Sequence, residues 1–297
     1  MSGALLGRQL NCRPNRTSSG AVMPMGRRSG LTWIEVLVIA VVLGVLLCLA
    51  IVWIGTLRES SRRQVCLNNL RQLAAGLRGY AEYFDAYPYA TVVNEKLPPE
   101  QRLSWYVGAW SSVGEGQTEL LVDLQKPWDT QGNLQPRIRT RTARSPLKTV
   151  DSALGPVPWF RCPSSREECP ADMPGLTSYV GIAGLGEDAA SLPPGDPRDG
   201  IWGYDRQTPL KAITDGTETT LLLAESALDN GPWTAGARPT VRGVDPEQVP
   251  CLGPGRQFGG NHPGGGNAAF ADGAARFLSN SIDPGVFAHM ATIGLSP

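Results

Sequence analysis

The sequence has no excess of charge of either sign, because Lys plus Arg and Asp plus Glu both total 27. Without a basic surplus, there is no electrostatic case for nucleic acid as a partner. Histidine is almost absent, with His262 and His289 as its two copies. No nucleophile elbow, P-loop spacing or cluster of acidic residues occurs. The sequence therefore predicts a protein that is not an enzyme, with no catalytic residue and no cofactor.

Apolar residues and turn formers are abundant instead. The chain is 41% hydrophobic, which is enough for a globular core. Its 35 glycines and 25 prolines are concentrated after residue 86. That composition predicts short strands joined by many turns, rather than long helices, over the C-terminal two thirds of the chain.

One long uncharged run lies near the N-terminus, from Val36 to Ile54. As a helix it spans about the 30 Å of a bilayer's hydrocarbon core. A buried helix in a soluble protein normally has a polar stripe, and this run has none. We therefore predict a transmembrane helix over 31–57. Arginines precede it and no acidic residue lies before Glu35, which predicts an N-terminus on the cytoplasmic side of the inner membrane.

Two ordinary export signals fit this run poorly. Cleavage by a signal peptidase needs small residues after the run, which instead ends Ile54-Gly55-Thr56-Leu57-Arg58. A lipoprotein signal would modify Cys48, but Leu46 and Leu47 stand where small residues are required. Neither signal accounts for the segment in front of the run.

That segment reads Arg27-Arg28-Ser29-Gly30-Leu31-Thr32-Trp33-Ile34-Glu35. It resembles the processing motif of type IV pilins and type II secretion pseudopilins. The resemblance implies that prepilin peptidase cuts after Gly30 and that the new N-terminus on Leu31 is methylated. It also implies that Glu35 pairs with the Leu31 amine, usually that of a neighbouring subunit, and so aligns subunits during assembly. The alternative for Glu35 is an interfacial charge directed toward water.

Two features depart from the family pattern. Leu31 stands where Phe is usual and Trp33 stands where Leu is common, although both residues keep the apolar character. The leader, residues 1–30, is also long for this class. Three methionines can start translation: Met1, Met23 and Met25.

An amphipathic pattern continues directly beyond the membrane run. Apolar residues recur at steps of three and four, at positions 66, 70, 73, 77, 80 and 84. This spacing predicts that the same helix continues over 58–85 with one stripe to bury, and that Tyr87-Pro88 ends it. A simple stalk would need a Gly/Ser or Pro linker after residue 57, and none is present.

Short segments spread over the rest of the chain carry a second resemblance. They are Cys66–Leu70, Phe160–Ser164, Ser178–Gly181, Ile213–Thr217, Thr220–Glu225, Gly231–Thr234, Phe258–Gly265 and Asp272-Gly273. Together they are similar to a large planctomycete family of pilin-like proteins with a C-terminal H-x9-D-G signature, a domain of unknown function (DUF1559). The resemblance implies an α+β fold in which the long helix packs on an antiparallel β-rich head over 86–297. Within that head, residues 114–157 and 184–210 predict long surface loops.

These segments predict strands and turns. Thr219 to Ala224 follows an Asp-Gly turn and reads as a buried strand. Residues 267–278 predict a hairpin around a two-residue turn, with positive φ at both Asp272 and Gly273. Alternation along the first strand directs Phe270 into the core.

His262 opens the H-x9-D-G signature. With Asp272 it offers two metal ligands, which are too few for a closed site. We therefore predict no bound metal, and a histidine that stabilises the turn beside Pro263.

Four cysteines lie in the predicted exported region, where disulfides persist. They are Cys66, Cys162, Cys169 and Cys251. Four cysteines allow three pairings, among which the local pair Cys162–Cys169 is preferred. A zinc site built from these cysteines is less expected, because no C-x-x-C spacing occurs.

Three functions compete. The first is a pilin-like subunit of a pilus or pseudopilus, with prepilin peptidase, other pilin-like subunits and membrane lipid as partners. The second is a solitary anchored module that binds extracellular polysaccharide and uses the pilin pathway only for export. Exposed tryptophans would favour the second: Trp105, Trp110, Trp128, Trp159, Trp202 and Trp233. The third, a membrane-tethered hydrolase, lacks catalytic groups. The sequence favours the first, with the head in the periplasm or at the cell surface.

Overall fold

The structure is a computed structural model that describes residues 32–114, 118–141 and 149–294. It divides into two compact units, the first ending at Val52 and the second beginning at Trp53. Helices and strands are both present, in a mixed α+β arrangement, as the sequence predicts.

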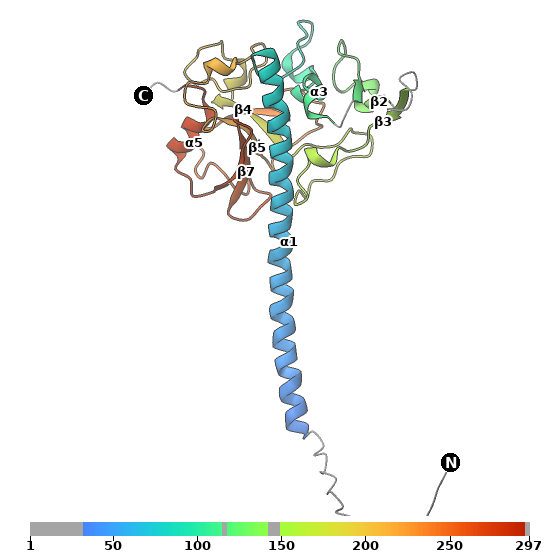
Figure 1. Cartoon of the computed structure of the whole chain (residues 1–297), viewed down its shortest axis with the longest axis vertical. Helices are drawn as coiled ribbons and strands as arrows, with labels where there is room; N and C mark the ends of the chain where they lie inside the picture. Colours follow the sequence, from blue (N-terminus) through green and yellow to red (C-terminus); the bar gives the residue numbers. More distant parts are fainter. Residues whose placement is uncertain (1–31, 115–117, 142–148, 295–297) are drawn as a thin grey trace, which may run out of the picture. The chain divides into compact units, whose positions relative to one another are not determined.

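The first element is helix α1, which runs without a break over Trp33–Phe84 (Figure 1). Every side chain from Trp33 to Val52 is exposed, and most of them are large and apolar. By length and composition α1 can cross a membrane, and no other described helix can. These properties are compatible with a single-pass membrane anchor.

The later turns of α1 bury one face in the second unit. Buried residues recur there at steps of three and four: Cys66, Leu67, Leu70, Leu73, Ala74, Leu77 and Ala81. Tyr80 is half-buried and Phe84 is 54% exposed, so the predicted stripe ends earlier than its spacing indicates. The helix stops because Asp85 adopts a left-handed φ of 60°, a conformation that Asp tolerates better than most residues.

The centre of the second unit is a five-stranded sheet in the order β6-β4-β5-β7-β8. All neighbours pair antiparallel except β4 and β6. The strands are β4 Tyr179–Leu185, β5 Leu221–Glu225, β6 Val241–Val244, β7 Gly265–Phe270 and β8 Ala275–Ser279. The predicted strand near 219–224 and the predicted hairpin are both confirmed.

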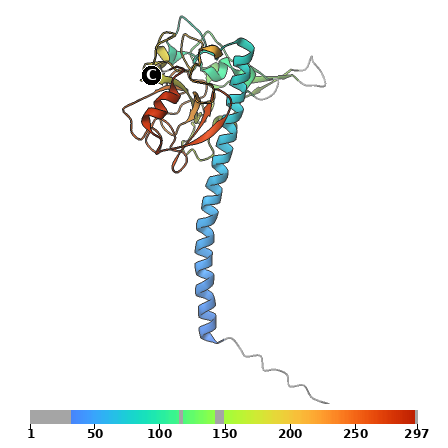
Figure 2. The ribbon, with the colours of Figure 1, turned by 60° about the vertical axis from the view of Figure 1, so that its left-hand side comes forward.

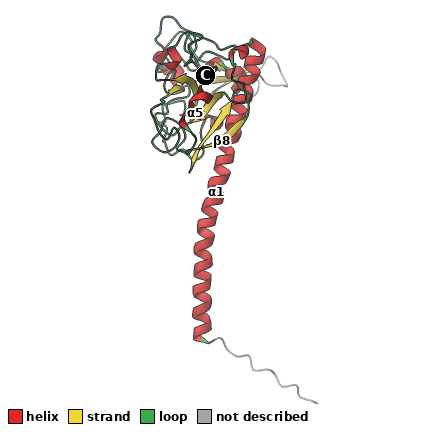
Figure 3. Cartoon of the chain, turned by 90° about the vertical axis from the view of Figure 1, so that its left-hand side faces the viewer, coloured by secondary structure: helices red, strands yellow, loops and turns green. Residues whose placement is uncertain are grey.

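Two apolar clusters lie on the two faces of this sheet. Tyr179 and Ala183 of β4 pack with the buried face of α1, whereas Val180 and Ile182 pack with helix α5. Helix α5 spans Pro284–Ala291 (Figure 3). Asp283 caps its N-terminus, because the Asp283 carboxylate accepts a hydrogen bond from the Val286 N–H. Because both faces are covered, β4 to β7 are buried almost throughout. Phe270 is 1% exposed, as predicted.

The turn between β7 and β8 differs from the prediction. Gly273 has a φ of 88°, but Asp272 does not have a positive φ. The Gly273 N–H donates to the Phe270 carbonyl at 3.0 Å and the Phe270 N–H donates to the Ala274 carbonyl at 2.8 Å. The loop therefore has Gly in the left-handed position as a bulge, and not a primed two-residue turn. Asp272 holds the loop by accepting from the Ala274 N–H at 2.8 Å.

Replacing Gly273 by Val should destabilise the protein by about 1 kcal/mol or more. The cause is backbone strain and not a clash, because an added Cβ would meet no atom closer than 3.8 Å. Gly273→Asn is the matched control, since Asn tolerates positive φ. Thermal melts of the detergent-solubilised chain should rank wild type above the Asn variant and the Asn variant above Val. Equal melting of all three would contradict the role of the left-handed position.

One of the two predicted loop regions contains regular structure. Residues 118–153 include a three-stranded antiparallel sheet of β1 Thr118–Leu121, β2 Arg137–Arg141 and β3 Thr149–Ala153 (Figure 2). Strand β2 alternates Arg with Ile and Thr, so its one apolar residue, Ile138, packs on the core but gives too little sequence signal to predict a strand. Residues 184–210 hold little beyond the end of β4 and single 3-10 turns, as predicted. The remaining short elements are η1 Pro99–Gln101, α2 Trp105–Gly108, α3 Trp110–Val113, α4 Gln131–Leu134, η2 Pro158–Phe160, η3 Ala189–Ser191 and η4 Leu210–Ala212.

Candidate functional site

Four side chains from distant parts of the sequence meet inside the second unit: Cys66, Cys162, Glu225 and His262. All four are buried, with exposed fractions of at most 2%. One sulfur, nitrogen or oxygen atom from each lies within 4.8 Å of the corresponding atoms of the other three. We call these four residues the buried cluster.

Each residue of the buried cluster is positioned by a different element. Cys66 lies on the buried face of α1, and Cys162 follows η2. Glu225 is the last residue of β5, and its carbonyl accepts a bond from the Gly259 N–H at 2.6 Å. That bond brings the loop before β7 alongside β5, and His262 sits in this loop, in a bridge with Gly265.

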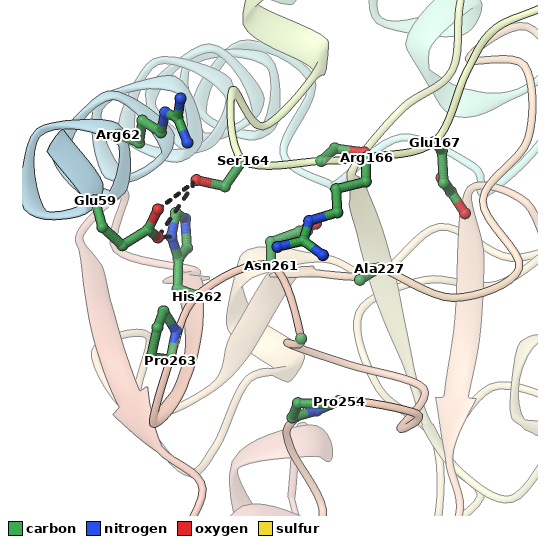
Figure 4. Close-up of a pocket in the computed structure, with 12 residues that line it drawn as sticks. Glu59, Arg62, Ser164, Arg166, Glu167, Ala227, Pro254, Asn261, His262 and Pro263 are labelled. Atoms are coloured by element: carbon green, nitrogen blue, oxygen red, sulfur yellow. Dashed lines mark hydrogen bonds and ion pairs between the residues drawn. The ribbon is translucent and has the colours of Figure 1, made fainter. Parts of the chain in front are cut away.

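The His262 ring is at the centre of the cluster. Its Nε2 lies 3.4 Å from the Cys162 sulfur and 3.2 Å from Glu225 Oε1. Its Nδ1 lies 2.6 Å from Oε1 of Glu59, a residue one turn beyond the membrane run on α1 (Figure 4). The imidazole therefore bridges the cluster to a carboxylate at its edge.

A second ring of polar groups holds these side chains in place. The Ser164 hydroxyl donates to both oxygens of Glu59, at 3.1 and 3.3 Å, and the Ser164 N–H donates to the Cys162 sulfur at 3.4 Å. The backbone and side-chain N–H groups of Asn267 donate to Glu225 Oε2, at 3.2 and 3.0 Å. The other oxygen, Oε1, is buried and lies 3.2 Å from His262 Nε2 as an ion pair, without a well-aligned hydrogen bond among the described residues.

The electrostatics follow from burial and from these contacts. Burial lowers the pKa of His262, but the bonds to Cys162, Glu225 and Glu59 outweigh it and raise that pKa to about 10. Burial raises the pKa of Glu225, but the His262 bond and charge outweigh it and lower that pKa. The Cys66 hydrogen bond and burial raise the pKa of Cys162. Without a further cation, the cluster therefore holds His262 as an imidazolium beside the Glu225 carboxylate, with the Cys162 thiol protonated.

Cys162 contacts His262, and His262 contacts Glu59, as the cysteine, histidine and carboxylate of a thiol-hydrolase triad do. A nucleophilic cysteine needs solvent access and a lowered pKa. Cys162 is 1% exposed, its pKa is raised, and Glu225 occupies the space against Nε2. Cys162 therefore has neither property of a nucleophile.

A cleft of about 650 Å³ reaches the edge of the cluster. Glu59 and His262 line it, together with Arg62, Arg166 and Glu167 (Figure 4). The Glu59 side chain is 30% exposed, whereas the His262 side chain is fully buried. Solvent and small ions thus reach the cluster from the Glu59 side.

The two ends of the H-x9-D-G signature lie in different places. The His262 side chain contacts Glu59, Cys162 and Glu225, whereas His262 takes part in the turn beside Pro263 through its backbone bridge with Gly265. Asp272 bonds within the β7–β8 turn and is not part of the cluster. The structure therefore does not bring His262 and Asp272 together as a pair of ligands.

The cysteines are free thiols in the described part of the chain. Cys162 lies close to Cys66, as a second free thiol, and not in the disulfide with Cys169 that the sequence favours. Cys169 is half-exposed and donates to the Pro170 carbonyl at 3.4 Å. Cys251 is buried in the other apolar cluster, beside Phe258 and Phe287.

Of the predicted processing site, Gly30 and Leu31 lie outside the described residues. Glu35 is in the first turn of α1. The Thr32 N–H donates to Glu35 Oε2 at 2.8 Å, and the Glu35 N–H donates to the Thr32 hydroxyl at 3.4 Å. This reciprocal pair is a capping box, and the T-x-x-E spacing of Thr32 and Glu35 is its signature in the sequence.

The tryptophans of the head are mainly core residues. Trp105, Trp110, Trp202 and Trp233 are at most 5% exposed, and several are in ring contact. Trp128 and Trp159 are half-buried. The described head thus presents no row of exposed indoles, which is the feature that would have favoured polysaccharide binding.

Comparison with known proteins gives one match. A family model described as "Protein of unknown function (DUF1559)" matches residues 55–285, which is most of the chain. No curated protein and no solved structure matches.

Proposed function

The chain belongs to the DUF1559 family, and we propose that it is a membrane-anchored, pilin-like structural subunit without catalytic activity. Prepilin peptidase removes the leader after Gly30. The mature chain then assembles through its N-terminal helix, with other pilin-like subunits, into a pilus or secretion pseudopilus. The head lies in the periplasm or at the cell surface.

Helix α1 is the observation that carries this proposal. It is unbroken from Trp33 to Phe84, apolar and exposed up to Val52, and buried on one face from Cys66 onward. An exposed apolar helix needs lipid or other apolar helices around it, because leaving so much apolar surface in water is unfavourable. One helix thus offers both an anchor and a surface on which copies can pack.

Glu35 adds the second support. Its carboxylate lies among apolar side chains at the start of α1, where an unpaired charge in lipid is costly. A mature N-terminus on Leu31 would supply a positive partner about one turn away. Cleavage and assembly would therefore be linked through one residue.

Processing can be tested directly. The mature protein should begin at Leu31, and Gly30→Leu should leave the precursor uncut, because a peptidase specific for glycine would no longer accept the site. Gly44→Leu is the matched control, since Gly44 lies inside α1 with no atom within 4 Å of an added Cβ. Immunoblots and intact masses from native membranes separate precursor from product. Normal cleavage of the Gly30 variant, or a mature N-terminus after residue 54, would contradict the proposal.

A further inference from the structure

Four ligand atoms converge in the buried cluster without a group that satisfies them all. We propose that Cys66, Cys162, Glu225 and His262 form a structural zinc site. It lies inside the second unit, and its existence does not depend on assembly of the chain into a filament.

The distances match tetrahedral coordination. Zinc bonds of about 2.3 Å to sulfur and about 2.0–2.1 Å to nitrogen and oxygen place neighbouring ligand atoms roughly 3.3–3.8 Å apart. His262 Nε2 lies 3.4 Å from the Cys162 sulfur and 3.2 Å from Glu225 Oε1. All four atoms fall within 4.8 Å of one another. A small contraction of the cluster therefore suffices to bind one ion.

The donor set favours zinc among common metals. Two thiolates with an imidazole and a carboxylate suit zinc, whereas calcium and magnesium prefer oxygen ligands alone. The protein supplies all four ligands, which closes the coordination sphere. A closed site is structural, in contrast to catalytic zinc, which keeps a position for water.

The surrounding contacts are those of a metal centre. His262 Nδ1 lies 2.6 Å from Glu59, and such a carboxylate behind a ligating histidine fixes the ring and its tautomer. Asn267 donates to Glu225 Oε2, so the buried Oε1, which lies 3.2 Å from His262 Nε2, is directed into the cluster. The Ser164 N–H directed at the Cys162 sulfur stabilises a thiolate.

Binding balances in protons and charge. Zinc binds cysteine as thiolate and histidine through an unprotonated nitrogen, so both sulfurs and His262 Nε2 would coordinate without protons, and Nδ1 would keep its proton for Glu59. Two thiolates and the Glu225 carboxylate then surround a doubly positive ion, which leaves one net negative charge on the site in place of three. The cleft beside Glu59 gives the ion its route from solvent.

The site would join elements that are far apart in the chain. Its ligands come from α1, the loop after η2, the end of β5 and the loop before β7. One ion would thus tie the helix to the sheet, and removing it should destabilise the head.

Metal analysis tests the proposal on the full-length protein, solubilised in detergent from native membranes under anaerobic conditions, without added metal or chelator. We expect about one zinc per chain in the wild type. Cys162→Ser should reduce the zinc content at least tenfold, and His262→Gln should reduce it strongly. Cys169→Ser is the matched control and should keep its zinc, because Cys169 is outside the cluster.

A second measurement does not depend on the folding of any variant. Cobalt exchanged into the wild type should give the visible and charge-transfer bands of tetrahedral thiolate coordination, and zinc should abolish them. Wild-type protein with free thiols and no zinc would overturn the proposal. So would a mass two hydrogens lower with a Cys66–Cys162 disulfide, the other arrangement that this sulfur pair allows in an exported protein.

Discussion

The Glu35→Ala chain should still be cleaved after Gly30 but should lose at least nine tenths of its assembled form. Cleavage depends on the leader and on Gly30, which this change leaves intact. Assembly, as we propose it, depends on the Glu35 carboxylate finding the Leu31 amine of a neighbour in a medium that does not solvate charge. Filament fractions and covalent cross-linking in native membranes measure the loss.

Glu35 has a second role that must be separated from the first. It caps α1 with Thr32, and losing a cap costs about 1 kcal/mol. Gln also serves in a capping box but carries no charge. Glu35→Gln should therefore keep the helix start and still fail to assemble. If Gln restores assembly while Ala does not, then the cap is what matters and the charge pairing is wrong.

Trp202→Ala should be among the most damaging single changes in the head, at about 3–5 kcal/mol. Trp202 is fully buried and in ring contact with Trp105 at 4.8 Å. It packs on Gly181 so closely that a Cβ there would lie 2.8 Å from the indole. Its Nε1–H also donates to the Leu222 carbonyl at 2.7 Å. Leu222 lies where the pairing register between β5 and β7 shifts. Truncation would leave both a cavity and an unpaired buried carbonyl.

Thermal unfolding of the detergent-solubilised chain measures this effect. A loss of that size should lower the melting temperature by roughly 10 °C. Trp128→Ala is the matched control, because Trp128 is half-buried and bonds to the Glu100 carbonyl at 2.9 Å. The control should melt only a little below wild type. Equal melting of the two variants would mean that Trp202 is not a core residue.

Periodicity predicted the long elements because it reports burial. The steps of three and four from Cys66 to Leu77 mark the face of α1 that packs on the sheet. The hairpin was predictable from Asp272-Gly273, but the turn type was not. An Asp-Gly pair suits both a turn with two left-handed residues and a turn in which Gly alone is left-handed, and the second is the one present. Strands β1 to β3 were not predicted, because they are only four or five residues long and few of their residues are apolar, although Leu120 and Ile138 pack on the core.

The buried cluster was beyond sequence analysis for a different reason. Spacing rules detect groups of residues that lie close together in the sequence. The four residues of the buried cluster are far apart in the sequence and are brought together by the sheet and by α1. One local signal was present and was not used. Glu225 ends the run Leu221-Leu222-Leu223-Ala224-Glu225, and a carboxylate closing a buried strand needs a partner. Glu59, in a stretch rich in arginine and serine, gave no such signal.

Photo-cross-linking from the exposed face of the membrane run tests the pilin-like assembly most directly. A photoreactive side chain at Leu43, which is 60% exposed, would be activated in native membranes. Adducts to a second copy of this chain, or to another pilin-like subunit, should form in the wild type and fall at least tenfold with Glu35→Gln. Adducts to lipid alone, or protein adducts of equal yield in the Glu35 variant, would contradict assembly through this helix.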